Sequence, residues 1–187
     1  MKIKSLVLII VIIFCYISCV GTRNTGLEVQ NPVAEISFDF TRLSGFSTNQ
    51  FAVWIEDTHG QYVKTLYVTK FTANGGWQRR PSSIPTWVNR SGISELSKAQ
   101  IDTISGATPR SQKLVYMWDG KDSKGAAVPP ADYVIYLEGT LRGENQVLYS
   151  APIRLGGGPS TPVVSVVYTG DAGNDREMIR DVRVTVR

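Results

Sequence analysis

The stretch of sequence that decides the fold is residues 118–139, which read WDGKDSKGAAVPPADYVIYLEG. Trp118 ends one alternating run of apolar residues, and residues 133–137 begin another, with the period of two that is typical of a β-strand. Between the two runs, Gly120 and Gly125 supply positive φ angles, and the neighbouring aspartates accept hydrogen bonds from turn backbone. The segment therefore predicts two strands joined by a structured turn, with aromatic rings in a core between two sheets.

Alternating runs continue on both sides of this segment. They occupy residues 34–40, 51–57, 62–69, 113–119, 132–139, 146–155, 162–169 and 178–186. About eight short strands at this spacing, with turn residues between them, predict an all-β fold: an immunoglobulin-like antiparallel β-sandwich. The two runs that flank His59 and Gly60 are expected to form a hairpin, and so are the last two runs of the chain.

One long segment, residues 71–110, has no alternation and predicts an irregular insertion in the sandwich. An insertion of this length between strands is often functional. Residues 94–102 (SELSKAQID) predict one or two helical turns, with Ser94 as the N-cap. Trp77 and Trp87 are expected to cover one open end of the sandwich.

The N-terminus has the organisation of a secretory signal. Lys2 and Lys4 precede an unbroken apolar run over residues 6–14. The small residue and cysteine that follow resemble a bacterial lipobox, although Tyr16 stands where leucine is usual. We therefore expect cleavage before Cys19 and lipidation of its thiol, with plain secretion or an uncleaved anchor as the alternatives.

The chain has two cysteines, Cys15 and Cys19, and both lie in this leader. The rest of the chain therefore has no disulfide, no thiolate nucleophile and no zinc–thiolate cluster. The expected organisation is a signal peptide (1–18), a lipidated cysteine with a flexible tether (19–31) and the sandwich (32–187). This organisation predicts a lipid-anchored protein of the cell envelope, on the extracytoplasmic side of a membrane.

Charge and composition argue against several classes of function. The 20 basic and 16 acidic side chains are scattered, so no basic stripe marks a nucleic-acid surface. The one histidine, His59, leaves no base for a Ser-His-Asp or Cys-His site and no imidazole metal cluster. Residues 119–125 (DGKDSKG) lack the spacing of a calcium loop. We expect no metal and no enzyme activity; hydrolysis by an unmarked pair of carboxylates is a weaker option.

The turn and the strands around it resemble known families. Residues 118–129 match W-D-G-x-D-x-x-G-x-x-V-P, and this pattern resembles the immunoglobulin-like repeat of the flagellar hook-capping protein and of many secreted bacterial proteins. Over residues 33–155 the chain is similar to a bacterial family of predicted periplasmic proteins of unknown function. Members of that family tend to be encoded with exported flavin-transfer and membrane electron-transfer proteins. The resemblance implies a flavin transferase and membrane redox proteins as partners.

The end of the insertion carries a second resemblance. Residues 102–108 (DTISGAT) match the D-x-x-[ST]-G-A-T pattern of covalently flavinylated proteins, in which a transferase joins FMN through its phosphate to the last threonine. The resemblance implies that Thr108 bears FMN. It implies a recognition segment made of Asp102, Ser105, Gly106 and Ala107. Pro109 departs from the commoner flavinylated sequences and favours extended backbone at the residue before it.

Together these patterns predict an extracytoplasmic lipoprotein that acts as a covalent FMN carrier in electron transfer. The alternative is a non-catalytic immunoglobulin-like lipoprotein of the cell envelope that binds another protein or serves as a scaffold. Side chains near the motif in sequence are candidate contacts of the flavin. They are Trp54, Trp77 and Trp87 as stacking partners of the ring, with a core role favoured for Trp54, and Arg79, Arg80 and Arg110 as partners of the phosphate.

Overall fold

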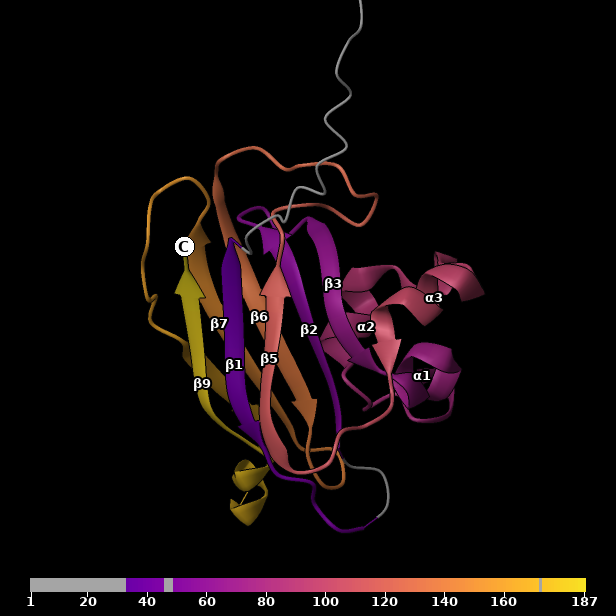
Figure 1. The fold of residues 1–187 in the computed structure, drawn as a ribbon. Helices are drawn as coiled ribbons and strands as arrows, with labels where there is room; N and C mark the ends of the chain where they lie inside the picture. The colour runs from indigo at the N-terminus through magenta and orange to yellow at the C-terminus, as the bar shows by residue number, and fades with distance from the viewer. Residues whose placement is uncertain (1–32, 46–48, 172) are drawn as a thin grey trace, which may run out of the picture. The chain divides into compact units, whose positions relative to one another are not determined.

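The computed structural model describes residues 33–45, 49–171 and 173–187, and these residues form two packed β-sheets (Figure 1). The signal peptide, Cys19 and the tether lie outside the described residues. The first sheet has the order β5-β1-β9 and consists of β1 (Ala34–Phe40), β5 (Gln112–Trp118) and β9 (Ile179–Val186). The second has the order β4-β3-β2-β6-β7-β8. It consists of β2 (Gln50–Asp57), β3 (Tyr62–Thr69), β4 (Ser105–Gly106), β6 (Asp132–Thr140), β7 (Gln146–Arg154) and β8 (Ser165–Thr169).

The main core lies between the two sheets, as the alternating runs predict. Inward-facing side chains of β1 and β2 meet there, with Phe38 edge-on to Phe51 at 5.6 Å between ring centroids. Trp118 is fully buried and lies edge-on to Tyr133 at 5.2 Å. The prediction of an all-β sandwich is therefore confirmed, and the aromatic residues of the 118–139 segment contribute to its core.

The turn within that segment is held by its own side chains. The Trp118 indole Nε1 donates to the carbonyl oxygen of Lys121 at 2.9 Å. Asp122 Oδ1 accepts hydrogen bonds from the backbone amides of Lys124 and Ala126 at 2.8 and 2.9 Å. The segment is a hydrogen-bonded turn, and no group of metal-ligating side chains occurs in the part of the chain that the structure describes.

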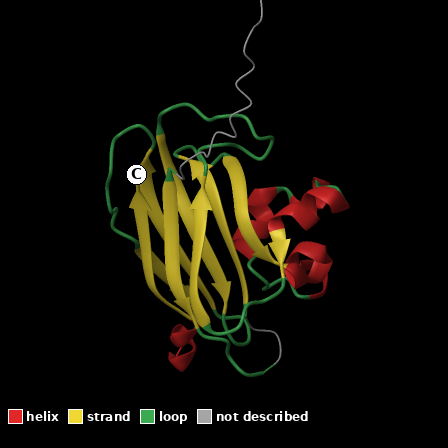
Figure 2. Ribbon diagram, viewed as in Figure 1, coloured by secondary structure: helices red, strands yellow, loops and turns green. Residues whose placement is uncertain are grey.

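The insertion interrupts the strands as expected, and it contains more helix than the one or two turns expected over residues 94–102. It contains η1 (Thr72–Gly76), α1 (Trp77–Arg79), α2 (Pro85–Ser91), η2 (Ile93–Glu95) and α3 (Lys98–Ile104). Figure 2 shows these helices gathered on one side of the sandwich, next to β3. Ser97 caps α3 by accepting from the Gln100 amide, and Gln100 Oε1 accepts from the Ser97 amide in return. The N-cap is therefore Ser97 rather than Ser94, because Ser94 falls in η2.

A second core joins the insertion to the outer face of the six-stranded sheet. Trp54 and Trp87 are both fully buried in this cluster, with Ala52 and Val68 of the sheet. The indole Nε1 of Trp87 donates to Thr65 Oγ1 at 2.8 Å. The expectation that Trp87 covers an open end of the sandwich was wrong, because the insertion packs on the sheet and encloses this ring.

Buried carboxylates fasten the insertion to the same face. Glu138 on β6 accepts hydrogen bonds from the backbone amides of Thr86 and Trp87, at 3.1 and 2.8 Å. Glu56 on β2 accepts from Trp54 Nε1 at 2.7 Å and pairs with Arg90 at 2.8 Å. Burial raises the pKa of Glu138 above its usual range, although the two amides oppose this effect. The insertion is thus held in place by polar contacts as well as by apolar packing.

The end of the chain differs from the expected hairpin. β8 pairs with β7 in the six-stranded sheet, whereas β9 pairs with β1 in the three-stranded sheet. The connection between them contains η3 (Gly173–Met178). The last two strands therefore lie in different sheets, and the hairpin prediction was wrong. The hairpin formed by β2 and β3 around His59 and Gly60 is confirmed.

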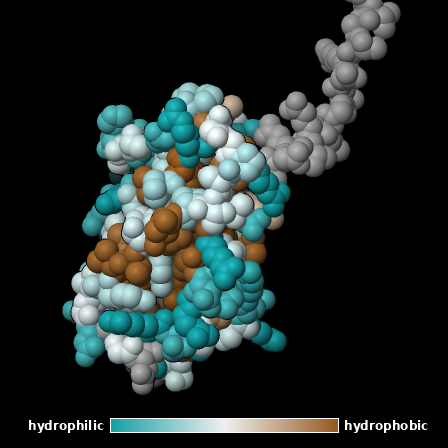
Figure 3. Space-filling model, turned by 90° about the vertical axis from the view of Figure 1, so that its left-hand side faces the viewer, coloured by the Kyte–Doolittle hydropathy of each residue, from teal (hydrophilic) through white to brown (hydrophobic). Residues whose placement is uncertain are grey.

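The side of the molecule opposite the helices carries apolar surface (Figure 3). The edge strand β8 contributes Val166 and Val167, which are exposed, and Val163 precedes them. β4 forms the other edge of the same sheet, so the flavinylation-like motif and this apolar edge lie at opposite ends of the strand order. None of the helices in residues 33–45, 49–171 and 173–187 has the length and apolar character needed to cross a bilayer.

Candidate functional site

The flavinylation-like motif, residues 102–108, spans the end of a helix, a short strand and a loop. Asp102 lies in the last turn of α3 and is exposed. Ser105 and Gly106 form β4, which pairs in parallel with the end of β3 through Val68↔Ser105 and Thr69↔Gly106. Residues 107–111 then run outside regular secondary structure to the start of β5. Sequence analysis missed β4, because two residues give no detectable alternation.

Gly106 has a packing role that its place in the motif does not reveal. A Cβ atom at this position would lie 2.7 Å from Cε2 and 3.0 Å from the hydroxyl oxygen of Tyr67. Real Cβ atoms essentially never approach another atom below 3.0 Å. Glycine at 106 therefore allows the Tyr67 ring to lie directly against β4.

Tyr67 in turn fixes the backbone that leads to Thr108. Its hydroxyl donates to the carbonyl oxygen of Ala107 at 2.6 Å. The ring stacks on Phe51 with centroids 5.2 Å apart and packs against Tyr116 at 4.9 Å. Burial raises the pKa of both tyrosines, so each phenol keeps its proton at neutral pH and Tyr67 remains a donor.

Four hydroxyl side chains lie in residues 102–111, and only one has both solvent access and no hydrogen bond in the structure. Thr103 Oγ1 donates to the Gln100 carbonyl oxygen, and Ser111 Oγ accepts from the Arg42 amide. Ser105 Oγ is fully buried without a partner. Thr108 is half-buried, and its Oγ1 is not among the fully buried side-chain atoms that lack a partner. Thr108 is therefore the one hydroxyl of residues 102–111 that combines solvent access with no hydrogen bond to a described residue.

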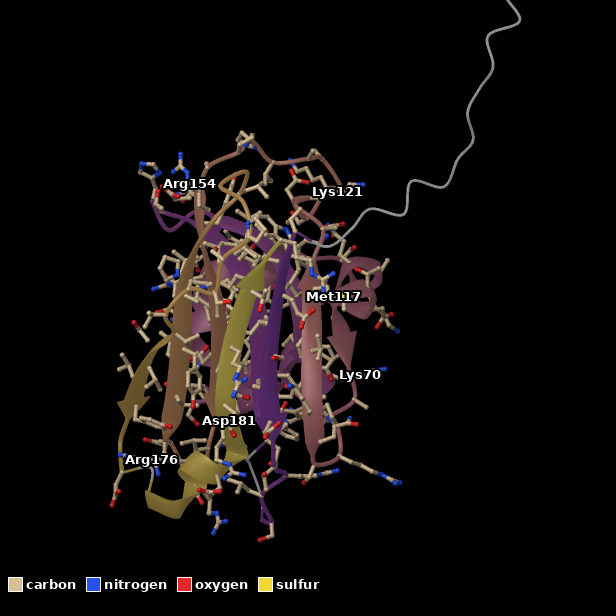
Figure 4. All side chains as sticks on the ribbon, turned by 60° about the vertical axis from the view of Figure 1, so that its left-hand side comes forward. Lys70, Met117, Lys121, Arg154, Arg176 and Asp181 are labelled. Carbon is tan, nitrogen blue, oxygen red and sulfur yellow. The ribbon has the colours of Figure 1, made fainter. Side chains whose placement is uncertain are left out.

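One cavity is lined in part by this segment, and a second begins at Phe71, two residues after β3. One, of about 320 Å³, lies between α3, β3 and β5 and is lined by Tyr62, Lys64, Thr65, Leu66, Leu96, Gln100, Thr103, Ile104, Met117 and Ser123. The other, of about 620 Å³, is lined by Phe71, Arg79, Arg80, Pro81, Ser82, Gly143 and Glu144. In Figure 4, Met117 and Lys70 lie on the same side of the molecule, where β5 contacts β3. Both volumes fall within the range of small-molecule sites.

The candidate flavin contacts differ in how accessible they are in the structure. Trp54 and Trp87 have no exposed surface, so neither can stack on a bound ring, and the core role favoured for Trp54 is confirmed. Trp77 is half-buried against the second core. Arg79 and Arg80 line the larger cavity. Sequence reasoning missed Tyr67, because only the pairing of β3 with β4 places it beside the motif.

Comparison with known proteins identifies the family. The model of the family described as predicted periplasmic protein (DUF2271) matches residues 34–169. These residues include the second core cluster, most of the main core, most of the sandwich and the whole insertion. No curated protein and no solved structure matches the chain. Because the match covers more than half of its length, the chain belongs to the DUF2271 family of predicted periplasmic proteins.

Proposed function

We propose that this protein is a lipid-anchored extracytoplasmic carrier of FMN, which a flavin transferase joins through its phosphate to Thr108. The single observation that carries the proposal is the state of the Thr108 hydroxyl: it retains solvent access and makes no hydrogen bond with any residue that the structure describes. A hydroxyl that acts as an acceptor must reach the active site of another enzyme, so it must be exposed and free of competing bonds.

The surrounding residues fit such an attachment site. The Tyr67 hydroxyl holds the Ala107 carbonyl, so the backbone before Thr108 is anchored to the sandwich. Gly106 presents no side chain, and Asp102 lies exposed on α3. The transferase would thus contact an anchored edge strand, the backbone of Gly106 without a side chain, and the exposed carboxylate of Asp102. Transfer from flavin adenine dinucleotide would form the phosphate ester at Thr108 Oγ1, with AMP as the leaving group.

The chemistry of the carrier belongs to the flavin, which accepts and donates electrons when bound. The protein holds the flavin outside the cytoplasm, where an unattached nucleotide would diffuse away. Lipidation of Cys19 would keep the carrier at a membrane surface. Its redox partners would then be a membrane donor and an extracytoplasmic acceptor, and the protein would not be an enzyme by itself.

Co-expression tests the proposal. The full chain is produced with a flavin transferase in an exporting bacterial host, and a denaturing gel is examined for flavin fluorescence. Wild type and Thr103→Ala should fluoresce, Ser105→Ala should fluoresce more weakly because Ser105 belongs to the recognition segment, and Thr108→Ala should be dark. A dark wild-type band favours the non-redox scaffold function, and fluorescence in Thr108→Ala assigns the flavin to another residue.

A further inference from the structure

The larger cavity lies at the end of the sheet where the flavin would be attached. Because β3 and β4 are parallel, both strands leave the sheet at the same end, with Thr69 beside Gly106. Phe71 follows Thr69 by two residues, and Thr108 follows Gly106 by two residues. Phe71, which lines the cavity, and Thr108, the attachment residue, therefore each lie two residues beyond the neighbouring ends of β3 and β4.

One wall of this cavity is aromatic and cationic. Phe71 is 44% exposed although it is a large apolar side chain, and the Arg79 guanidinium lies 5.9 Å from the centroid of its ring. An exposed aromatic face beside a cation suits a planar ligand that has an apolar body and a polar edge.

The second arginine is fixed in place by the protein. Arg80 Nη2 donates to the Gly143 carbonyl oxygen at 2.6 Å, and its Nη1 is buried with no hydrogen-bond partner. Neither Arg79 nor Arg80 takes part in an ion pair with a described residue. Glu144 is the one acid that lines the cavity. Its negative charge attracts the Arg80 guanidinium electrostatically, although the two groups lie beyond ion-pair distance. The cavity thus carries two cations against one acid.

On the premise that Thr108 carries FMN, we propose that this cavity receives the isoalloxazine ring and that Arg80 and Glu144 set its reduction potential. Uptake of two electrons from a redox partner, together with one proton from solvent, leaves one negative charge at the N1–C2=O edge of the ring. A nearby guanidinium stabilises that charge and favours the reduced form, whereas a nearby carboxylate opposes it.

The smaller cavity is a poorer fit for the tethered ring. Its β3 residues are Tyr62 and residues 64–66, which precede Val68, the partner of Ser105. A group that extends from Thr108 would have to turn back along β4 to reach it. Lys64, the one cation in its lining, is already paired with Asp119 at 2.9 Å.

The test uses the full chain loaded with FMN and measures its two-electron midpoint potential by reductive titration against a reference dye. Arg80→Gln should lower the equilibrium constant for reduction about tenfold, a shift of about −30 mV for a two-electron couple. Glu144→Gln should shift the potential upward. Arg183→Gln removes the same charge as Arg80→Gln from an exposed position on β9, in the other sheet, and should leave the potential unchanged. Fluorescence anisotropy should fall in Phe71→Ala, because the ring would then turn freely on its tether.

The outcomes distinguish failure of the carrier function from failure of the cavity assignment. If wild type carries no flavin at Thr108, the carrier function fails and the cavity assignment fails with it. If flavin is attached and both Arg80→Gln and Glu144→Gln match Arg183→Gln in potential, the carrier function stands and the cavity assignment is overturned. Glu144 is exposed and forms no ion pair with a described residue, so its variant keeps the test valid even if Arg80→Gln folds poorly.

Discussion

The Tyr67 hydroxyl donates a hydrogen bond to the carbonyl oxygen of Ala107, at 2.6 Å, one residue before Thr108. This bond links the central aromatic packing of the sandwich to an otherwise irregular segment, because the same ring packs on Phe51 and Tyr116. The candidate attachment residue is therefore held at its N-terminal side, while its own hydroxyl stays open to solvent.

Removing that bond should loosen the segment. Tyr67→Phe keeps the ring but leaves the Ala107 carbonyl without its donor, so the free energy of unfolding should fall by about 1 kcal/mol. Hydrogen exchange at the amides of Ala107, Thr108 and Arg110 should become faster. The matched control is Tyr116→Phe, since the Tyr116 hydroxyl makes no hydrogen bond with a described residue. Equal exchange in the two variants would contradict a specific anchoring role for Tyr67.

Adding one methyl group to β4 should disturb the same contact. In Gly106→Ala the new Cβ would lie 2.7 Å from Tyr67 Cε2, and such overpacking costs about 1–3 kcal/mol. Urea denaturation measures this cost. A double-mutant cycle with Tyr67→Ala should show that alanine at 106 costs little once the ring is gone. A cost that is the same in both backgrounds would mean that the ring is not its cause.

The buried carboxylate of Glu138 should make stability depend on pH. Burial raises its pKa in the folded protein above the ordinary value of 4.5. From about pH 4.5 up to the raised pKa, the folded state keeps a proton that the unfolded state has lost, so stability falls as pH rises, by at most about 1.4 kcal/mol per pH unit. Glu138→Gln lacks this titration.

Urea denaturation of wild type and Glu138→Gln at a series of pH values above 4.5 isolates the effect. The difference in unfolding free energy, wild type minus variant, should decrease as pH rises through the window. A difference that increases with pH would mean that the amides of Thr86 and Trp87 outweigh burial and lower the pKa.

The lipid anchor makes a separate prediction. Cys19→Ser removes the thiol that would be acylated, so the protein should leave the membrane fraction and fail to incorporate labelled fatty acid. Cys15→Ser should behave as wild type, because that residue would leave with the signal peptide. Fatty-acid labelling that persists in Cys19→Ser would place the anchor elsewhere.

Much of the sandwich could be predicted because its strands are half-buried and alternate. Trp118 and the strand from 132 to 140 lie where the pattern places them, since Gly and Asp fix the turn between them. The insertion could not be predicted in the same way. Its buried face consists of Trp87 and a few apolar residues in short helices, and the contacts that hold it come from Glu138 and Glu56 on distant strands.

The candidate site could likewise be predicted from the sequence only in part. The motif itself can be read from residues 102–108, but the reasons for its shape depend on tertiary contacts. Gly106 is needed because Tyr67 lies against it, and Ser105 is shielded because β4 pairs with β3. Neither contact leaves a local signal, because the paired residues are more than thirty positions apart in the chain.

The most direct test of the central claim is mass spectrometry of the protein after co-expression with a flavin transferase. Trypsin should release residues 99–110 as one peptide that contains Thr103, Ser105 and Thr108. The carrier account predicts that this peptide gains the mass of FMN less one water and that fragmentation places the addition on Thr108. An unmodified peptide from protein exported together with an active transferase would contradict the account.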